Sequence, residues 1–395
     1  MDLTKLSSYD YNLPKELIAQ EHAYPAHNSK LLYFDGKIHD LIFKDIVNLL
    51  SSKDILFFNN SKVVKARIIW DDKINFKIIW ENNEEKLCKN CELLFLKKLN
   101  NNTFESLVRP GKKLKKWKTI KITKQNKEYI FKVKNYSENW RIIEIISPKK
   151  DIFEILDEIG KMPLPPYIEY SEEKEKPYQP IQAKKEGSVA APTASLHFTP
   201  ELIKRFKEQN IKFLESTLHI WMWTFKTVDT EDITKYNIHS ETVEIPLSIF
   251  EKIADLKKNH YITAVGTTST RILESLPYLY QKIKLENPKL YNQLKRDFWE
   301  NFKINKEQAN NFIQNINFYN NTIQFDTKLY IYPGFEFKII DKLITNFHLP
   351  KSSLLMLVAA FMWYENMFKC YQHAIKNNYK FFSFWDAMFI DKTKF

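Results

Sequence analysis

The segment DILFFNNSKVVKARI at residues 54–68 indicates how the fold begins. Its apolar runs ILFF and VVKARI have the composition of strands, and the preceding FKDIVNLLSS has the apolar spacing of a helix. Helices and strands alternate again from residue 151 onward, for example in YITAVGTTSTRILESL at 261–276. The chain of 395 residues is longer than a single average domain, so we expect two domains or one domain with a large insertion. We expect residues 1–68 and 151–395 to form one α/β domain.

Residues 69–150 have a different pattern and interrupt that domain. Short β-leaning runs follow one another between turns rich in Lys and Asn: FKIIW, CELLFLKKL, TFESLV, KTIKIT, YIFKVK and WRIIEII. Several short strands at this spacing predict a small inserted β-barrel-like domain. Residues 281–326 are rich in Asn, Lys and Gln and show little apolar periodicity, so we interpret them as a peripheral excursion of the larger domain.

Composition and the N-terminal residues favour a soluble, cytoplasmic protein. No apolar run approaches the roughly 18 residues of a membrane span, and MDLTKLSSYDYNLPKELIAQ has neither the basic segment nor the apolar core of a secretory signal. The chain has only three cysteines, which is an odd number and too few for a disulfide framework. Cys88 and Cys91 form a lone C-x2-C pair without a nearby histidine, which favours a coincidence at a strand edge over a zinc site.

The net charge points to a class of partner. Lys and Arg number 60 against 48 Asp and Glu, which gives a formal charge of +12 and a pI near 9.2. Such a balance suits a polyanion such as nucleic acid, because neutralising phosphates releases counterions. The alternative is a lysine-rich solvated surface without a nucleic-acid partner.

Three segments concentrate small, polar and ionisable residues in apolar surroundings. They are GSVAAPTASLHFT at 187–199, TLHIWMWTFKTVDTEDITKYNIHSETVEIP at 217–246, and VGTTSTRILES at 265–275 together with LITNFHLPKSS at 343–353. Their hydrogen-bonding and titratable residues are Thr193, His197, His219, His239, Glu241, Gly266, Thr267, Thr268, Arg271, Asn346 and His348. Taken singly, each histidine is more often a structural residue than a catalytic one.

Two common nucleotide-binding motifs are missing from these segments. GTTSTR lacks the spacing and the lysine of a Walker loop, which argues against binding of a nucleoside triphosphate. The chain has no G-x-G-x-x-G, which argues against an ordinary Rossmann methyltransferase or dehydrogenase.

Ordered strings along most of the chain resemble those of the S-adenosylmethionine:tRNA ribosyltransferase-isomerases of queuosine biosynthesis. These strings are LPKELIAQ, DILFFNNSKVVKARI, VRPGKKLK, MPLPPYI, GSVAAPTASLHFT, TLHI, IHSETVEIP, AVGTTSTRILES, YIYPGFEFKIIDKLITNFHLPKSSLLMLVAAF and FFSFWDAM. Only 69–150 and 281–326 match loosely. The resemblance implies an α/β catalytic domain that is interrupted by a smaller β-barrel domain.

The resemblance also implies a transferase and isomerase reaction in tRNA modification. S-adenosylmethionine gives its ribosyl carbons to 7-aminomethyl-7-deazaguanine at the wobble position, adenine and methionine leave, and epoxyqueuosine-tRNA remains. No metal and no further cofactor are expected. Such chemistry needs a base beside the sulfonium and a donor for the departing adenine. The expected ionisable set is His197, His219, His239, Glu241 and His348.

Other residues are expected to hold the two substrates. Substrate binding is assigned to Thr193, Gly266, Thr267, Thr268, Arg271 and Asn346. Phosphate contacts to tRNA are assigned to Arg67, Arg109, Lys112, Lys113, Lys115 and Lys116, because Arg and Lys dominate recognition of the nucleic-acid backbone. We expect the chain to act as a monomer, without a membrane partner.

The chain also departs from the family pattern. Tyr170 stands where the family usually has Arg, Ser195 where it has Gly, and Pro180 and Gln182 where it has Thr and Tyr. These departures bear on the details of the substrate loop, and the Tyr170 change could remove an RNA or cofactor contact. A second hypothesis is a catalytically silent homologue that still binds tRNA, which the replacement of glycine by tryptophan described below would favour. An unrelated S-adenosylmethionine-dependent RNA methyltransferase is a third, which would release S-adenosylhomocysteine.

Tryptophan stands at several positions where the family has glycine. The chain has only 6 glycines in 395 residues, where about 7% is usual. The affected positions are Trp221, Trp223, Trp363, Trp385 and Trp117, and with weaker alignment Trp70, Trp80 and Trp140. We hypothesise that the gene reads UGA as glycine and that a UGA-to-Trp translation wrote these residues. The alternative is a drifting homologue that gained aromatic residues.

Overall fold

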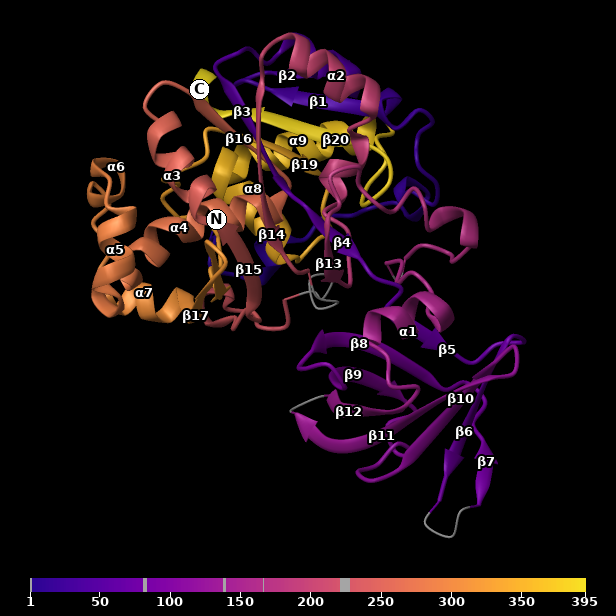
Figure 1. Cartoon of the computed structure of the whole chain (residues 1–395). Coiled ribbons are helices and arrows are strands. Elements are labelled where there is room, and N and C mark those ends of the chain that lie inside the picture. The colour runs from indigo at the N-terminus through magenta and orange to yellow at the C-terminus, as the bar shows by residue number, and fades with distance from the viewer. Residues whose placement is uncertain (1, 81–83, 138–139, 166, 221–227) are drawn as a thin grey trace. The chain divides into compact units, whose positions relative to one another are not determined.

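The computed structural model (Figure 1) describes residues 2–80, 84–137, 140–165, 167–220 and 228–395. The chain divides into two compact units. The large unit comprises Met1–Ser61, Pro166–Lys185 and Ala191–Phe395, and the small unit comprises Lys62–Pro165 and Glu186–Ala190.

A ten-stranded mixed sheet forms the centre of the large unit. In spatial order its strands are β17 (Ile313–Tyr319), β18 (Thr322–Thr327), β15 (Glu241–Pro246), β14 (Lys212–Leu218), β3 (Asp54–Asn59), β16 (Tyr261–Val265), β19 (Lys342–Asn346), β20 (Ala387–Asp391), β1 (Lys30–Phe34) and β2 (Ile38–Ile42). The neighbours from β14 to β19 are parallel, as are β20 and β1, and the other pairs are antiparallel. With its helices, this sheet gives the expected α/β architecture.

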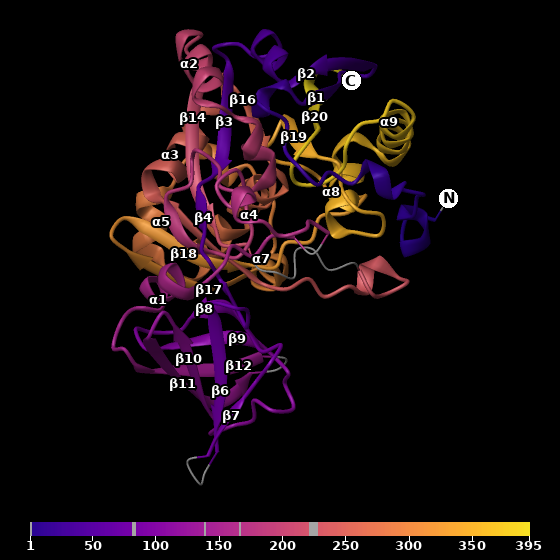
Figure 2. The same cartoon turned by 90° about the vertical axis from the view of Figure 1, so that its right-hand side faces the viewer.

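The helices of the large unit lie before, between and after these strands. They are α2 (Pro200–Glu208), α3 (Leu247–Leu256), α4 (Thr267–Glu286), α5 (Pro288–Leu294), α6 (Asp297–Glu300), α7 (Lys306–Phe312), α8 (Ser353–Met362) and α9 (Tyr364–Lys376). Figures 1 and 2 show α8 and α9 (yellow) together near β19 and β20. No helix in the described ranges is both long and apolar enough to cross a membrane.

Local sequence signals explain several of these elements. The Oγ1 of Thr199 accepts the Leu202 N–H at 3.3 Å and Pro200 occupies the first turn, so α2 begins where its capping residues predict. FKDIVN forms a 3-10 helix at Phe43–Asn48 instead of an α-helix. The segment 281–326 contains the end of α4, α5 to α7 and the strands β17 and β18, which extend one end of the sheet.

The core of the large unit follows from its apolar central strands. All six residues of β3 are buried, and β19 and β20 are buried throughout, as expected for strands covered on both faces. On one face Phe58 meets Phe198 with ring centroids 4.9 Å apart, and α2 adds Leu202 and Phe206 to the same cluster.

An antiparallel eight-stranded sheet forms the small unit. Its order is β5 (Arg67–Ile69), β8 (Glu92–Lys98), β9 (Thr103–Arg109), β12 (Trp140–Ser147), β11 (Lys127–Ser137), β10 (Thr119–Lys124), β6 (Ile74–Ile79) and β7 (Glu85–Leu87). The sheet curls (Figure 1), and β5 and β7 form its two ends, so the described strands make a half-barrel and not a closed barrel. Helix α1 (Ile152–Ile159) packs Phe153 on Phe95 at 5.6 Å. A separate two-stranded sheet pairs β4 (Ser61–Val63) with β13 (Lys185–Ser188).

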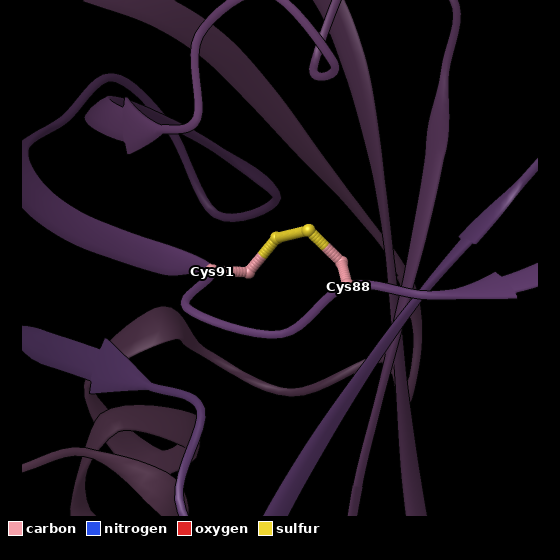
Figure 3. The surroundings of a disulfide bond; sticks show 2 residues. All are labelled: Cys88 and Cys91. Carbon is pink, nitrogen blue, oxygen red and sulfur yellow. A yellow bond between two sulfur atoms is a disulfide. The ribbon is translucent and has the colours of Figure 1, made fainter.

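Cys88 and Cys91 are joined by a disulfide bond, which corrects the expectation of an unpaired strand-edge coincidence (Figure 3). The pair lies between β7 and β8, where Asn90 has a positive φ of 59° and turns the chain. This turn brings the two Cα atoms to 5.7 Å, within the range of disulfides. Both cysteines are buried. Counting cysteines could not reveal the pairing because it depends on this turn.

Candidate active site

A pocket of the large unit gathers residues from distant parts of the chain. Its described lining comes from the segment before α2, from Ile220 after β14, from the start of α4, from the end of β19 through the start of α8, and from Tyr167, Phe382 and Ser383. Because β16 and β19 are parallel neighbours, the residues that follow them meet at one edge of the sheet. Of the residues assigned from the sequence, the pocket brings together Thr193, Gly266, Thr267, Thr268, Asn346 and His348.

Gly266 joins β16 to α4 and requires the backbone freedom of glycine. Its φ is +92°, and it occupies the N-cap position of a 20-residue helix. A Cβ atom there would lie 3.5 Å from the Ala194 Cβ, which is ordinary contact, so the backbone conformation and not space selects glycine.

His197 lies behind the pocket in a buried polar network. Its Nε2 is 3.0 Å from the Asn346 Nδ2, its Nδ1 is 3.0 Å from the Ser29 Oγ, and its ring stacks on Phe43 at 4.8 Å. Burial lowers the pKa of His197 to about 4, so the ring is neutral at pH 7. The Asn346 Oδ1 accepts the Thr193 hydroxyl at 2.9 Å, so its Nδ2 donates to Nε2 of the neutral ring. Both ring nitrogens therefore have protein partners, and Nε2 orients Asn346.

His348 is the histidine that lines the pocket among the described residues. Its Nε2 is 2.8 Å from the Thr345 Oγ1, and its backbone N–H donates to the Tyr371 hydroxyl at 3.0 Å. Its Nδ1 has no protein partner in the described part of the chain. Burial lowers the pKa of His348 to about 3, which keeps the ring neutral. One ring nitrogen therefore remains available to a ligand.

An aromatic pair forms another wall of the pocket, and sequence reasoning missed it. The rings of Tyr167 and Phe382 stack with centroids 4.5 Å apart at 29°, and the Tyr167 hydroxyl lies 2.7 Å from the Ser383 Oγ. Phe382 has a positive φ of 74°, which is rare for an aromatic residue. The available signal was their position inside MPLPPYI and FFSFWDAM.

Glu241, Arg271 and His239 form a second buried cluster, which does not line the pocket. The Arg271 Nη1 forms a short ion pair with Glu241, and its Nε donates to the Leu329 carbonyl at 3.1 Å. The His239 Nε2 lies 3.6 Å from the Glu241 Oε1. Burial, with the adjacent charge of Arg271, lowers the pKa of His239 to about 3. This cluster therefore balances one positive and one negative charge beside a neutral imidazole.

His219 lies apart from both clusters. Its Nε2 is 3.6 Å from the Glu244 Oε1, and this contact is the main cause of the lowered pKa of Glu244. The following Trp221 and Trp223 lie outside the described residues. Within the described ranges, no three His, Cys, Asp or Glu side chains are grouped as metal ligands.

The residues assigned to tRNA phosphates all belong to the small unit. Lys112, Lys113, Lys115 and Lys116 are exposed on the turn between β9 and β10, which we call the lysine loop. The buried Leu114 anchors this loop. Arg109 is 81% exposed at its side chain and lies 3.8 Å from the Glu92 carboxylate, whereas the Arg67 Nε pairs with the same carboxylate at 2.6 Å. Arg67 is thus less available to a phosphate than the lysine loop.

The departures from the family pattern lie at different depths. Ser195 is fully buried, and its hydroxyl has no partner among the described residues. Gln182 is also buried, and its side-chain amide has no partner there. Tyr170 is exposed and donates its hydroxyl to Glu175 at 2.7 Å. None of these three residues lines the pocket.

The tryptophans at suspected glycine positions fall into two groups. Trp117 and Trp363 have positive φ values of 71° and 64°, and both are more than half exposed. The other described ones have no positive φ: Trp70, Trp80, Trp140 and Trp385. Trp299, which has no counterpart in the family pattern, is buried, and its ring centroid lies 4.4 Å from that of Phe250 at a tilt of 30°.

Comparison with known proteins places this chain in a family. The family model described as queuosine biosynthesis protein matches residues 6–390. The chain is 39% identical over 392 residues to the S-adenosylmethionine:tRNA ribosyltransferase-isomerase of Sulfurihydrogenibium sp., covering 98% of this chain and 99% of the relative. It is 38% identical over 390 residues to the protein of that name from Thermosipho melanesiensis, with the same coverage.

A solved structure was also matched, that of S-adenosylmethionine tRNA ribosyltransferase from Thermotoga maritima. It is 29% identical, with 97% of this chain and 99% of that chain covered and a TM-score of 0.47. The resemblance inferred from the sequence strings is confirmed by the family match and the curated relatives. The chain belongs to the queuosine biosynthesis family that includes the S-adenosylmethionine:tRNA ribosyltransferase-isomerases.

Proposed function

We propose that this protein transfers the ribosyl moiety of S-adenosylmethionine to 7-aminomethyl-7-deazaguanine at the wobble position of tRNA and isomerises it. The products are epoxyqueuosine-tRNA, adenine and methionine. The observation that carries the proposal is one pocket whose described walls come from six of the family-like strings, in a chain that matches the family over residues 6–390.

The lining of the pocket suits a reaction with a cationic substrate. The described lining residues include neither lysine nor arginine, and His348 is neutral, so these residues present no charged side chain that would repel a sulfonium. Thr193 and Asn346 offer polar atoms, while the aromatic pair of Tyr167 and Phe382 offers a flat apolar wall. Shielding from water favours the reactive intermediates that such a transfer requires.

We assign proton exchange with the substrate to His348, because it lines the pocket and keeps one ring nitrogen free of protein partners. His197 is a positioning residue, because both its nitrogens are used by Asn346 and Ser29. His219, His239, Glu241 and Arg271 lie outside the described lining, so we assign them no direct contact with the substrate. The reaction is proposed to need neither a metal nor another cofactor.

We assign tRNA backbone binding to the lysine loop and Arg109. These cations are exposed, and Arg and Lys side chains dominate phosphate contacts. The aromatic ring of Trp117 lies beside them, with the Lys116 Nζ 5.1 Å from its centroid. The substrates of the proposed enzyme are thus tRNA and S-adenosylmethionine.

The test is incubation of the purified protein with S-adenosylmethionine and tRNA carrying the aminomethyl base, with a chelator present. Nucleoside mass spectrometry should detect epoxyqueuosine, and the supernatant should contain adenine and methionine in equal amounts. S-adenosylhomocysteine as the stoichiometric product would mean methyl transfer instead. Binding of tRNA without any product would favour the silent homologue, to which the Trp117 and Trp363 departures point.

A further inference from the structure

The first turn of α4 presents unused hydrogen-bond donors at the pocket. Gly266 provides no side-chain cap, and no acceptor in the described part of the chain takes the backbone N–H groups of Thr267, Thr268 and Ser269. Helix N-termini leave such donors, which side chains, water or ligands normally satisfy. Because α4 is 20 residues long, its dipole is also fully developed at this end.

The hydroxyl of Thr267 is a second unused donor at the same place. Thr267 is 7% exposed and lines the pocket, and its hydroxyl has no hydrogen-bond partner among the described residues. The neighbouring Thr268 differs, because its Oγ1 accepts from the Asn59 Nδ2 at 3.4 Å. Although the residue is buried, its hydroxyl is not sealed from solvent, so it borders a space that a ligand can enter.

The charges around the pocket make this helix end its main positive feature. The described lining residues include no Lys, Arg, Asp or Glu. Arg271, one turn further along α4, is paired with Glu241 and adds no net charge. The N-terminus of a helix is equivalent to roughly half a positive charge and favours a bound anion.

We propose that the first turn of α4, with the Thr267 hydroxyl, binds the carboxylate of the methionyl group of S-adenosylmethionine. This inference rests on the proposed function, because that function supplies the ligand. The carboxylate is the only anionic group of S-adenosylmethionine. The helix end attracts it and repels the sulfonium, which orients the ligand with its cationic centre toward the neutral residues Thr193, Asn346 and His348.

The experiment compares S-adenosylmethionine with decarboxylated S-adenosylmethionine by calorimetric titration of the full chain. The natural ligand should bind at least about 10-fold more tightly, since hydrogen bonds to a charged group are the stronger kind. Thr267→Val should weaken S-adenosylmethionine about 10-fold and leave the decarboxylated ligand unchanged. Thr263→Val is the matched control, because Thr263 lies buried in β16, its hydroxyl also lacks a described partner, and it does not line the pocket.

The possible outcomes separate the two proposals. Equal affinity of the unsubstituted protein for both ligands would overturn the carboxylate site and leave the proposed function intact. Failure to bind either ligand would count against the proposed function itself. If Thr267→Val weakened tRNA and spared S-adenosylmethionine, the donors would serve an RNA phosphate and the inference would be wrong. The comparison of ligands on the unsubstituted protein decides the question even if Thr267→Val does not fold.

Discussion

Replacing Trp363 by glycine and by alanine tests whether the backbone at this position is built for glycine. Trp363 links α8 to α9 with φ 64° and ψ 145°, and its side chain is 52% exposed. Both substitutions remove the same indole and its edge contact with Phe395 at 5.4 Å. The difference between the two variants therefore isolates the cost of a Cβ atom in this conformation.

The expected difference follows from two opposing effects. A Cβ atom at such φ and ψ values costs of order 1–3 kcal/mol, because this region is nearly exclusive to glycine. In ordinary backbone, alanine is favoured over glycine by roughly 0.5–1 kcal/mol. The free energy of unfolding of the large unit should therefore be about 1 kcal/mol higher for Trp363→Gly than for Trp363→Ala.

The assay is urea unfolding of both variants, with the same pair at Trp299 as control. Trp299 lies buried within α6, so both of its substitutions should cost about 3–5 kcal/mol. At Trp299 the alanine variant should be more stable than the glycine variant by up to about 1 kcal/mol, which is the opposite order from that expected at Trp363. A Trp363→Ala variant as stable as Trp363→Gly would refute the reasoning. UGG codons at Trp221, Trp223, Trp363 and Trp385 would separately end the genetic-code hypothesis.

Three further results are expected. Burial raises the pKa of Asp386 from 3.8 to about 6, so the protonated carboxyl contributes fully to stability below about pH 4, and this contribution is lost as the pH rises through 6. The Tm from thermal unfolding should fall over this pH range, and the Asp386→Asn variant should not show that fall. Glu274 accepts the backbone N–H groups of Lys338, Ile339 and Ile340 at 2.8–2.9 Å, so Glu274→Gln should cost about 1–3 kcal/mol in chemical unfolding. Replacing the four lysines of the lysine loop by alanine should reduce the slope of log binding constant against log salt concentration for tRNA by up to about 3, and it should leave S-adenosylmethionine binding unchanged. An unchanged slope would exclude phosphate contacts by these lysines.

Local patterns in the sequence predicted elements better than they predicted contacts. The start of α2 followed from Thr199 and Pro200, and the strand β3 followed from the apolar run ILFF. A single helix end or buried strand depends on neighbouring residues, which the sequence displays directly. FKDIVN became a 3-10 helix, because apolar spacing does not distinguish this tighter helix from an α-helix.

The site depends on contacts that no local pattern contains. His197 and Asn346 are 149 residues apart, and they meet because β19 ends beside the segment that precedes α2. Tyr167 and Phe382 were not singled out, since a stacked pair leaves no spacing signal when its members are so distant. The disulfide was likewise hidden, because it follows from the turn at Asn90.

The buried polar network also narrows which histidine can exchange a proton with a substrate. The sequence alone does not rank the candidate histidines as proton-transfer groups. In the structure, burial lowers the pKa of His197, His239 and His348 and keeps these rings neutral at pH 7. His197 has no free ring nitrogen, and His239 lies beside the charge of Arg271, outside the pocket lining. Only His348 combines a place in the described lining with a nitrogen free of protein partners. A neutral imidazole can accept a proton but has none to give as an imidazolium, which supports the proposed assignment of proton exchange to His348 as a base.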